Sequence, residues 1–351
     1  MKTILCFGEV LLRLSAPNKE PLLRSASLDA TFGGTEANVA VSLSHFGLTT
    51  RVVTVLPQND LGDACLGELR RYGVDVSCVQ RQPGRMGLYF LTPGAMLRPS
   101  RLFYDREGSA FAAADPSGFD WSSLLANVDW LHISGVTPAV SATAAAAARA
   151  AVKAAAGRGI PVSFDCNFRA SLWQGREHEA AEALRAFAEV ATLLFAGPFD
   201  IDKLLGPERG AGGDTGAGAD AVGSGPAAAA AHARAAARAF AAWPMLRHVT
   251  GTHRRVHSSD HQTLTAYVTD RDGQSQSRSY ELNPIVERIG GGDAFAAGVL
   301  YGLCRSLGRQ RTADFAAAAT ALKHASCGDF NTAGVAEVQF LIDTGAADVQ
   351  R

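Results

Sequence analysis

The stretch Gly290-Gly291-Gly292-Asp293-Ala294-Phe295-Ala296-Ala297-Gly298 is the most informative part of this chain. Apolar residues at spacings of three and four follow Asp293, which predicts a helix that begins directly after the glycines. The first N–H groups of a helix have no intrahelical partner, so together with the helix dipole they form a site for an anion. Asp293 at this point can accept a proton from a hydroxyl that attacks phosphorus. The stretch predicts a phosphoryl-transfer centre; the alternative is an ordinary glycine-rich turn with Asp293 as a helix cap.

The composition fits a globular protein rather than one that binds nucleic acid or a membrane. The chain has 351 residues, 47% of them hydrophobic, and a net charge of −1, which provides no field for nucleic acid or an anionic membrane. No apolar stretch reaches the roughly 18 residues of a membrane span. Glycine and charged residues interrupt the apolar start, which predicts a buried strand rather than a signal peptide. The six cysteines form no CxxC pair, which favours free thiols and a cytoplasmic location.

Short apolar runs alternate with longer helical patterns along the chain. We expect strands at residues 4–7, 51–56, 130–134, 161–164 and 193–195, and helices at residues 37–46, 61–72, 143–156 and 179–190. This alternation indicates an α/β fold with a parallel sheet that is covered by helices on both faces.

Two regions depart from the alternation. Residues 10–32 and 86–106 show strand-like patterns and turn residues without intervening helices, which predicts a small antiparallel sheet that serves as a lid over a site. Residues 206–225 are rich in Gly and Ala, and we expect a flexible insertion there because this composition cannot bury enough apolar surface.

Two further motifs place polar groups where ligands bind. Gly33 and Gly34 precede a predicted helix, so backbone can approach a ligand closely, and Asn38 lies one turn inside that helix. Asn167 and Arg169 follow an apolar strand, at the edge of a parallel sheet where ligands bind, and the arginine fork suits a carboxylate or phosphate. The alternatives are a simple helix start for the first motif and a surface ion pair for the second.

Tyr89, Tyr104 and Arg106 lie on the predicted lid. Phenolic hydroxyls next to an arginine suit a polyhydroxylated, acidic small molecule, although tyrosine is also an ordinary strand former.

Taken together, these motifs resemble the ribokinase-like (PfkB-type) sugar kinases from about residue 4 to residue 340. Within that family the chain is most similar to 2-keto-3-deoxygluconate kinases. The closer similarity rests on Gly87-Leu-Tyr-Phe, Arg101-Leu-Phe-Tyr104-Asp-Arg106-Glu-Gly-Ser-Ala, Leu131-His-Ile-Ser-Gly-Val-Thr-Pro138, Asp165-Cys-Asn-Phe-Arg169 and Gly328-Asp-Phe-Asn331.

The resemblance implies a single Rossmann-like three-layer α/β/α domain over residues 1–351 with a β-sheet lid. It implies ATP and Mg²⁺ as cofactors, leaves a monovalent cation open, and implies a homodimer formed through the lid sheets. Asp293 would be the catalytic base, and Gly290, Gly291 and Gly292 would form the anion hole. The residues implied to bind the substrate are Gly33, Gly34, Asn38, Tyr89, Tyr104, Arg106, Asn167, Arg169 and Asp329.

Three segments depart from the family pattern, the first of which reads Glu287-Arg-Ile-Gly-Gly-Gly-Asp293 where DTxGAGD is usual and the form DRxGGGD also occurs. The Asn-x-x-Glu that helps to organise Mg²⁺ reads Gly197-Pro-Phe-Asp200, so Asp200 is the remaining indirect metal contact. The glycine-rich nucleotide loop reads Thr250-Gly251-Thr252-His-Arg-Arg, which leaves the contacts with ATP open.

The expected function is ATP-dependent phosphorylation of a sugar acid, with 2-keto-3-deoxygluconate converted to its 6-phosphate. Arg106 and Arg169 favour a substrate with a carboxylate over the alternative, a fructokinase or other ketose kinase, because a neutral ketose needs no such fork. A non-catalytic sugar-binding protein with a degraded metal site is the alternative from another class, and the presence of Asp293 argues against it.

Overall fold

The computed structural model describes residues 2–208 and 225–345, which contain a nine-stranded mixed sheet. Six strands run parallel in the order β4 (Thr49–Val53), β1 (Thr3–Phe7), β9 (Trp130–Ser134), β10 (Val162–Asp165), β11 (Leu193–Phe195) and β12 (His248–Ser258). The antiparallel strands β13 (His261–Asp270), β14 (Gly273–Gln276) and β15 (Tyr280–Leu282) complete the sheet. The strand expected at residues 51–56 is divided, because β5 (Val55–Pro57) leaves the sheet to pair with β6 (Gln80–Gln82).

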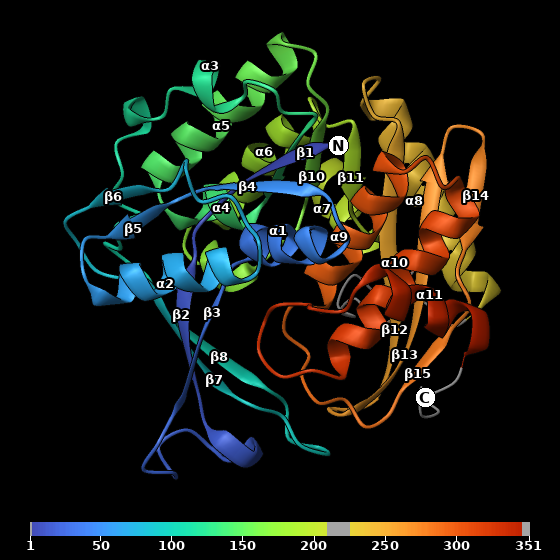
Figure 1. Ribbon diagram of the computed structural model, residues 1–351. Helices are drawn as coiled ribbons and strands as arrows, with labels where there is room; N and C mark the ends of the chain where they lie inside the picture. Colours follow the sequence, from blue (N-terminus) through green and yellow to red (C-terminus); the bar gives the residue numbers. More distant parts are fainter. Residues whose placement is uncertain (1, 209–224, 346–351) are drawn as a thin grey trace.

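Helices cover both faces of the sheet, as predicted (Figure 1). Alternate residues of β1 point to opposite sides, so Ile4 and Cys6 pack into one core, and Leu5 and Phe7 pack into the other. The first core is covered by α1 (Thr35–His45), α2 (Asp60–Arg71), α9 (Gly291–Cys304), α10 (Arg309–His324) and α11 (Val335–Thr344). The second is covered by α3 (Trp121–Leu124), α4 (Val136–Val140), α5 (Ala142–Gly157), α6 (Glu177–Ala188), α7 (Pro198–Leu205) and α8 (Pro226–Ala242). The body is therefore a three-layer α/β/α sandwich.

The lid is a separate four-stranded sheet that extends away from the body (Figure 1). Its order is β3 (Asp29–Gly33), β2 (Leu11–Ser15), β7 (Leu88–Thr92) and β8 (Arg101–Asp105). The expectation of an antiparallel sheet is correct for two of the three pairings, but β2 and β7 run parallel. Each of these two strands leaves the body in the same direction and returns along its own antiparallel partner, which makes the central pair parallel.

Two other expectations concern membrane-spanning helices and the glycine-rich insertion. None of the described helices is both long and apolar enough to cross a membrane. Most of the predicted insertion at residues 206–225 lies outside the described residues, which resume at residue 225 just before α8.

Candidate active site

A large pocket of about 1120 Å³ lies between the lid and the carboxyl ends of the parallel strands. This is the edge at which open α/β sheets bind ligands. Every residue singled out from the sequence lines this pocket: Gly33, Gly34, Asn38, Tyr89, Tyr104, Arg106, Asn167, Arg169, Asp200, Thr250, Gly251, Thr252, Gly290, Gly291, Gly292, Asp293 and Asp329. The fold therefore brings together segments that are nearly 300 residues apart in sequence.

The glycine turn at the start of α9 is shaped by tight packing on one side and open space on the other. Gly290 has a φ of 82°, and a Cβ atom there would lie 2.0 Å from the carbonyl oxygen of Asp329. A Cβ atom on Gly291 would lie 2.4 Å from the His324 ring, whereas one on Gly292 would meet nothing within 4 Å. The first two glycines are required by packing, and the third leaves the backbone open to a ligand.

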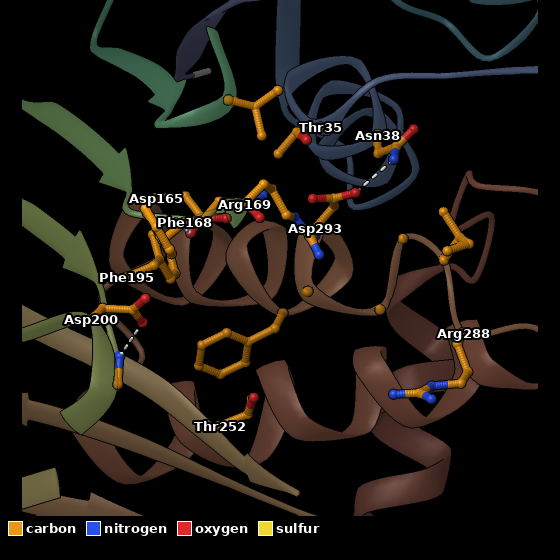
Figure 2. A pocket seen from close by; sticks show the side chains of 18 of the residues that line it. Thr35, Asn38, Asp165, Phe168, Arg169, Phe195, Asp200, Thr252, Arg288 and Asp293 are labelled. Atoms are coloured by element: carbon orange, nitrogen blue, oxygen red, sulfur yellow. Dashed lines mark hydrogen bonds between the residues drawn. The ribbon is translucent and has the colours of Figure 1, made fainter. Parts of the chain in front are cut away.

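Asp293 lies in the first turn of α9, and its side chain is buried in the floor of the pocket. Its Oδ2 accepts a hydrogen bond of 2.6 Å from Nδ2 of Asn38, whose Oδ1 in turn accepts one from the N–H of Gly34 (Figure 2). Burial raises the pKa of Asp293 to about 7, although the Asn38 hydrogen bond and the Arg169 charge oppose the rise. A carboxyl group that titrates near neutral pH is suited to accept a proton.

Arg169 extends toward Asp293 from the segment that follows β10 (Figure 2). Within residues 2–208 and 225–345 its guanidinium makes no hydrogen bond and no close ion pair. Two further carboxylates share this region. Burial raises the pKa of Asp165 well above its usual range, and the charges of Asp293 and Asp200 add to the effect. This end of the pocket therefore holds one buried carboxylate, two half-buried carboxylates and one guanidinium that is available to a ligand.

Asp200 also stabilises its own helix. It is the third residue of α7, and its Oδ2 accepts a hydrogen bond of 2.9 Å from the N–H of Gly197 (Figure 2). Burial raises the pKa of Asp200, and the Gly197 N–H lowers it. The described residues contain no cluster of three His, Cys, Asp or Glu side chains that could hold a metal ion directly.

On the lid side, a buried ion-pair network connects β2 and β7 to the body. Arg13 donates to Asp329 Oδ1 at 2.9 Å and forms an ion pair with Glu287. The Tyr89 hydroxyl donates to the other oxygen of Asp329. The charges of Glu287 and Asp329 raise the pKa of Arg13, so the guanidinium stays charged despite its burial. Asp329 is thus fixed from two lid strands while it lines the pocket.

Arg106 has a buried partner that the sequence did not indicate. Its guanidinium forms an ion pair with Glu9, and Nε donates to Oε2 at 2.7 Å. Ser109 donates to the other oxygen of the same carboxylate. The Arg106 guanidinium also lies 5.7 Å from the centre of the Tyr104 ring. A ligand therefore meets an arginine that is already oriented and partly neutralised.

Thr250, Gly251 and Thr252 line the opposite end of the pocket, but they do not form a loop as the family pattern suggested. They are part of β12, where all three pair with β13 and Thr250 also pairs with Phe195 of β11. A Cβ atom on Gly251 would lie 3.0 Å from the His232 ring of α8, so glycine is required here for close packing. Figure 2 shows Asp293 between Asn38 on one side and Thr252 and Arg288 on the other.

Sequence reasoning missed several buried polar residues around the pocket. Glu9 and Glu36 line it, and Glu36 accepts hydrogen bonds from Ser134 and Thr137. Arg13 fixes Asp329, as described above. Glu9 lies two residues after the first strand, and Arg13 interrupts an apolar run. Both are unusual positions for a charge, and their distant partners explain them.

The sequence of the chain is similar to those of known carbohydrate kinases. Residues 1–237 match the family described as pfkB family carbohydrate kinase. A 2-dehydro-3-deoxygalactonokinase from Haloferax volcanii is 30% identical over 58% of this chain and 63% of its own length. A 2-dehydro-3-deoxygluconokinase from Thermoproteus tenax is 33% identical over 59% of this chain and 62% of its own length. The chain thus spans less than two thirds of the length of these curated relatives.

Solved structures match over nearly the whole chain. The 2-dehydro-3-deoxygluconokinase of Thermotoga maritima is 35% identical, with a TM-score of 0.89 over 98% of this chain and 100% of that one. A PfkB family carbohydrate kinase from Listeria grayi is 31% identical, with a TM-score of 0.88 over 97% of this chain and 100% of that one. The family match covers well over half of the chain, and the chain belongs to the pfkB family of carbohydrate kinases.

Proposed function

We propose that this protein transfers the γ-phosphoryl group of ATP to the primary hydroxyl of 2-keto-3-deoxygluconate, forming the 6-phosphate. The observation that carries the proposal is the position of Asp293. Its buried carboxylate lies behind an open glycine turn, in a pocket that also presents Arg169, Arg106 and two tyrosines. Relatives and a structural neighbour named 2-dehydro-3-deoxygluconokinase support the same substrate class.

In this reaction Asp293 accepts the proton of the attacking hydroxyl. Asn38 holds the accepting carboxylate through Oδ2, and the pKa of about 7 allows it to be ionised and still basic near neutral pH. The N–H of Gly291 donates to the carbonyl of Arg288 at 3.4 Å, so the N–H groups of Gly292 and Asp293 at the start of α9 would face the developing negative charge. Donors held in place before the reaction stabilise such a charge most strongly. Positioning and electrostatics supply most of the catalysis in this class of reaction.

The pocket is chemically suited to a nucleotide with Mg²⁺. The charges of Asp293 and Asp200 raise the pKa of Asp165, and a bound cation would relieve this repulsion. Carboxylate oxygens are the ligands that Mg²⁺ prefers, and the ion usually keeps several waters and binds one or two carboxylates plus phosphates. Asp165 and Asp200 would hold it through water, and the ion would neutralise charge on the transferring phosphoryl group. Thr250, Gly251 and Thr252 would contact the nucleotide from β12.

Substrate charge is the basis for choosing a sugar acid. The Arg169 guanidinium makes no hydrogen bond or close ion pair within the described residues, so it can bind the carboxylate with a charge-assisted hydrogen bond. Arg106 contributes a second, already oriented donor from the lid. Gly33, Gly34, Asn167, Tyr89, Tyr104 and Asp329 would bind the hydroxyls and the keto group.

A second candidate substrate is 2-keto-3-deoxygalactonate, which differs from the gluconate in the configuration of one hydroxyl. The Haloferax volcanii relative, named 2-dehydro-3-deoxygalactonokinase, favours it. Both candidates carry the carboxylate that Arg169 would bind.

We further propose a homodimer in which lid sheets pair. Strand β8 is an edge strand, and it exposes Leu102 and Phe103 to 40% and 65%. Sedimentation velocity should show a dimer for the wild type and a monomer for Phe103→Asp.

All six cysteines are free thiols, in keeping with a cytoplasmic enzyme that uses ATP.

The test is an ADP-release assay of the purified protein with the two sugar acids, fructose and ribose as acceptors. One of the two sugar acids should give the highest kcat/KM, and Asp293→Asn should abolish most of that turnover. Preference of the wild type for fructose would support the ketose kinase instead. Sugar binding without any ADP release would support the non-catalytic alternative.

A further inference from the structure

A fully buried lysine lies beneath the glycine turn. Lys323 is the second-last residue of α10, and its solvent exposure is 0%. Lysine is almost never completely buried unless its charge is compensated, because removing an ammonium from water is costly. The residue was not among the predicted site residues, and it does not line the pocket.

The contacts of Lys323 join it to the turn from below. Its Nζ donates a hydrogen bond of 3.2 Å to the carbonyl of Ser326. A Cβ atom on Gly290 would lie 3.2 Å from Cε of the same lysine, so the side-chain stem supports the first glycine directly. The carbonyl of the next residue, His324, accepts hydrogen bonds from the N–H groups of Val286 (2.9 Å) and Glu287 (3.3 Å).

Two acids that hold the turn act on the ammonium through their charge, without an ion pair within 4 Å. Glu287 Oε1 accepts hydrogen bonds from the N–H groups of Arg288 (2.9 Å) and Ile289 (3.2 Å), so its carboxylate helps to fold the turn. Asp329 closes the other side, with its carbonyl against Gly290. Burial lowers the pKa of Lys323, while the charges of Glu287 and Asp329 raise it.

We propose that Lys323 is a positioning residue of the anion hole. Its ammonium supplies a positive charge that is covalently part of the chain, in place of a free monovalent cation. It offsets the charge of Glu287 and Asp329 together with Arg13, and it keeps the turn in the form in which the first N–H groups of α9 face the pocket. Because this positive charge is part of the chain, turnover requires no free monovalent cation. The inference rests on the proposed phosphoryl transfer.

The experiment compares three variants in buffers whose only monovalent cation is tetramethylammonium, which is too large to enter the space left by a side chain. Lys323→Ala removes the charge and leaves room for a small cation. Lys323→Met removes the charge but keeps the apolar stem, and Lys323→Arg retains the charge. Lys153→Ala, an exposed lysine of α5, is the matched control.

Wild-type kcat should not change when KCl or ammonium chloride is added. Lys323→Met should lower kcat on the order of 10²-fold with a smaller change in KM for the sugar, since a misplaced turn affects the transition state most. Lys323→Ala should show a similar loss, and ammonium or potassium should restore several-fold of it. Lys323→Arg should lie between Lys323→Met and the wild type.

Strong stimulation of the wild type by potassium, or wild-type kcat in Lys323→Met, would overturn the proposal. If Lys323→Ala does not fold, Lys323→Met and Lys323→Arg still decide the question. Affinity for a non-hydrolysable ATP analogue, measured by calorimetry without sugar, should be highest for the wild type, intermediate for Lys323→Arg and lowest for Lys323→Met. A wrong substrate assignment would fail in the acceptor screen but leave this nucleotide comparison intact, so the two failures can be told apart.

Discussion

The two ends of the pocket are built in different ways. At the glycine-turn end, the reacting groups come from one continuous stretch, Gly290–Asp293, and backbone packing against Asp329 and His324 fixes its shape. At the lid end, the side chains come from strands that are far apart, and buried ion pairs fix them: Arg106 with Glu9, and Arg13 with Asp329 and Glu287.

This difference indicates how each end should respond to substitution. Chemistry at the turn depends on one carboxylate and a few amides, so a single change there should affect turnover with little effect on folding. Recognition at the lid depends on charges that also join the lid to the body, so changes there should affect stability and substrate choice together.

The largest effect on turnover is expected for Asp293→Asn. The amide keeps the size and the contact with Asn38 but cannot accept the proton, so kcat should fall by about 10²- to 10⁴-fold while sugar affinity changes little. Steady-state kinetics and calorimetry with the sugar test this. Near-normal turnover in the purified variant would remove Asp293 from the role of base.

Arg13→Met should separate the lid from the body. The change leaves Glu287 and Asp329 buried without their guanidinium, and breaking a buried pair of this kind costs about 3–5 kcal/mol. Urea unfolding should show the loss, and Arg149→Met, at an exposed arginine of α5, should change the free energy of unfolding by no more than about 0.5 kcal/mol. Equal stability of the two variants would show that the network does not hold the lid.

Arg169→Ala and Arg106→Ala should both weaken use of the sugar acid but should differ in their effect on stability. Each should lower kcat/KM for the sugar acid by about 10- to 100-fold, since a charge-assisted hydrogen bond is lost, while fructose should be little affected. Only Arg106→Ala should also lower the melting temperature, because it leaves Glu9 buried without its ion pair. Equal losses on both substrates would argue for the ketose kinase.

The last two predictions concern pH and Asp293. Its pKa is raised to about 7, so the folded state binds a proton more tightly than the unfolded chain does between the usual value of 3.8 and 7. Stability contributed by this proton is present below pH 4 and is lost as the pH rises toward 7. Asp293→Asn should therefore raise the melting temperature more at pH 8 than at pH 5.

The same titration sets the acid limit of catalysis. Wild-type kcat/KM should fall about tenfold per pH unit below 7, because the protonated acid cannot accept the substrate proton. An acid limit near pH 4 would show that Asp293 is not the group that titrates.

The sequence alone was sufficient for the fold class and for seventeen of the residues that line the pocket. Apolar spacing predicted β1, β9, β10 and β11 and the helices between them. The periodicity of a strand or helix depends only on residues that are close in sequence. The glycine turn and Asp293 were likewise predicted from contiguous residues. The roles assigned to the individual site residues remain predictions for the experiments above.

Only the tertiary structure decided which partner each buried charge has. Arg13 and Asp329 are 316 residues apart, Arg106 and Glu9 are 97 apart, and neither pair follows from any local pattern. The parallel pairing of β2 with β7, the strand at Thr250–Thr252 and the burial of Lys323 have the same origin. Periodicity and helix caps depend on near neighbours, whereas the partner of a buried charge depends on which chain segments the packed core brings together.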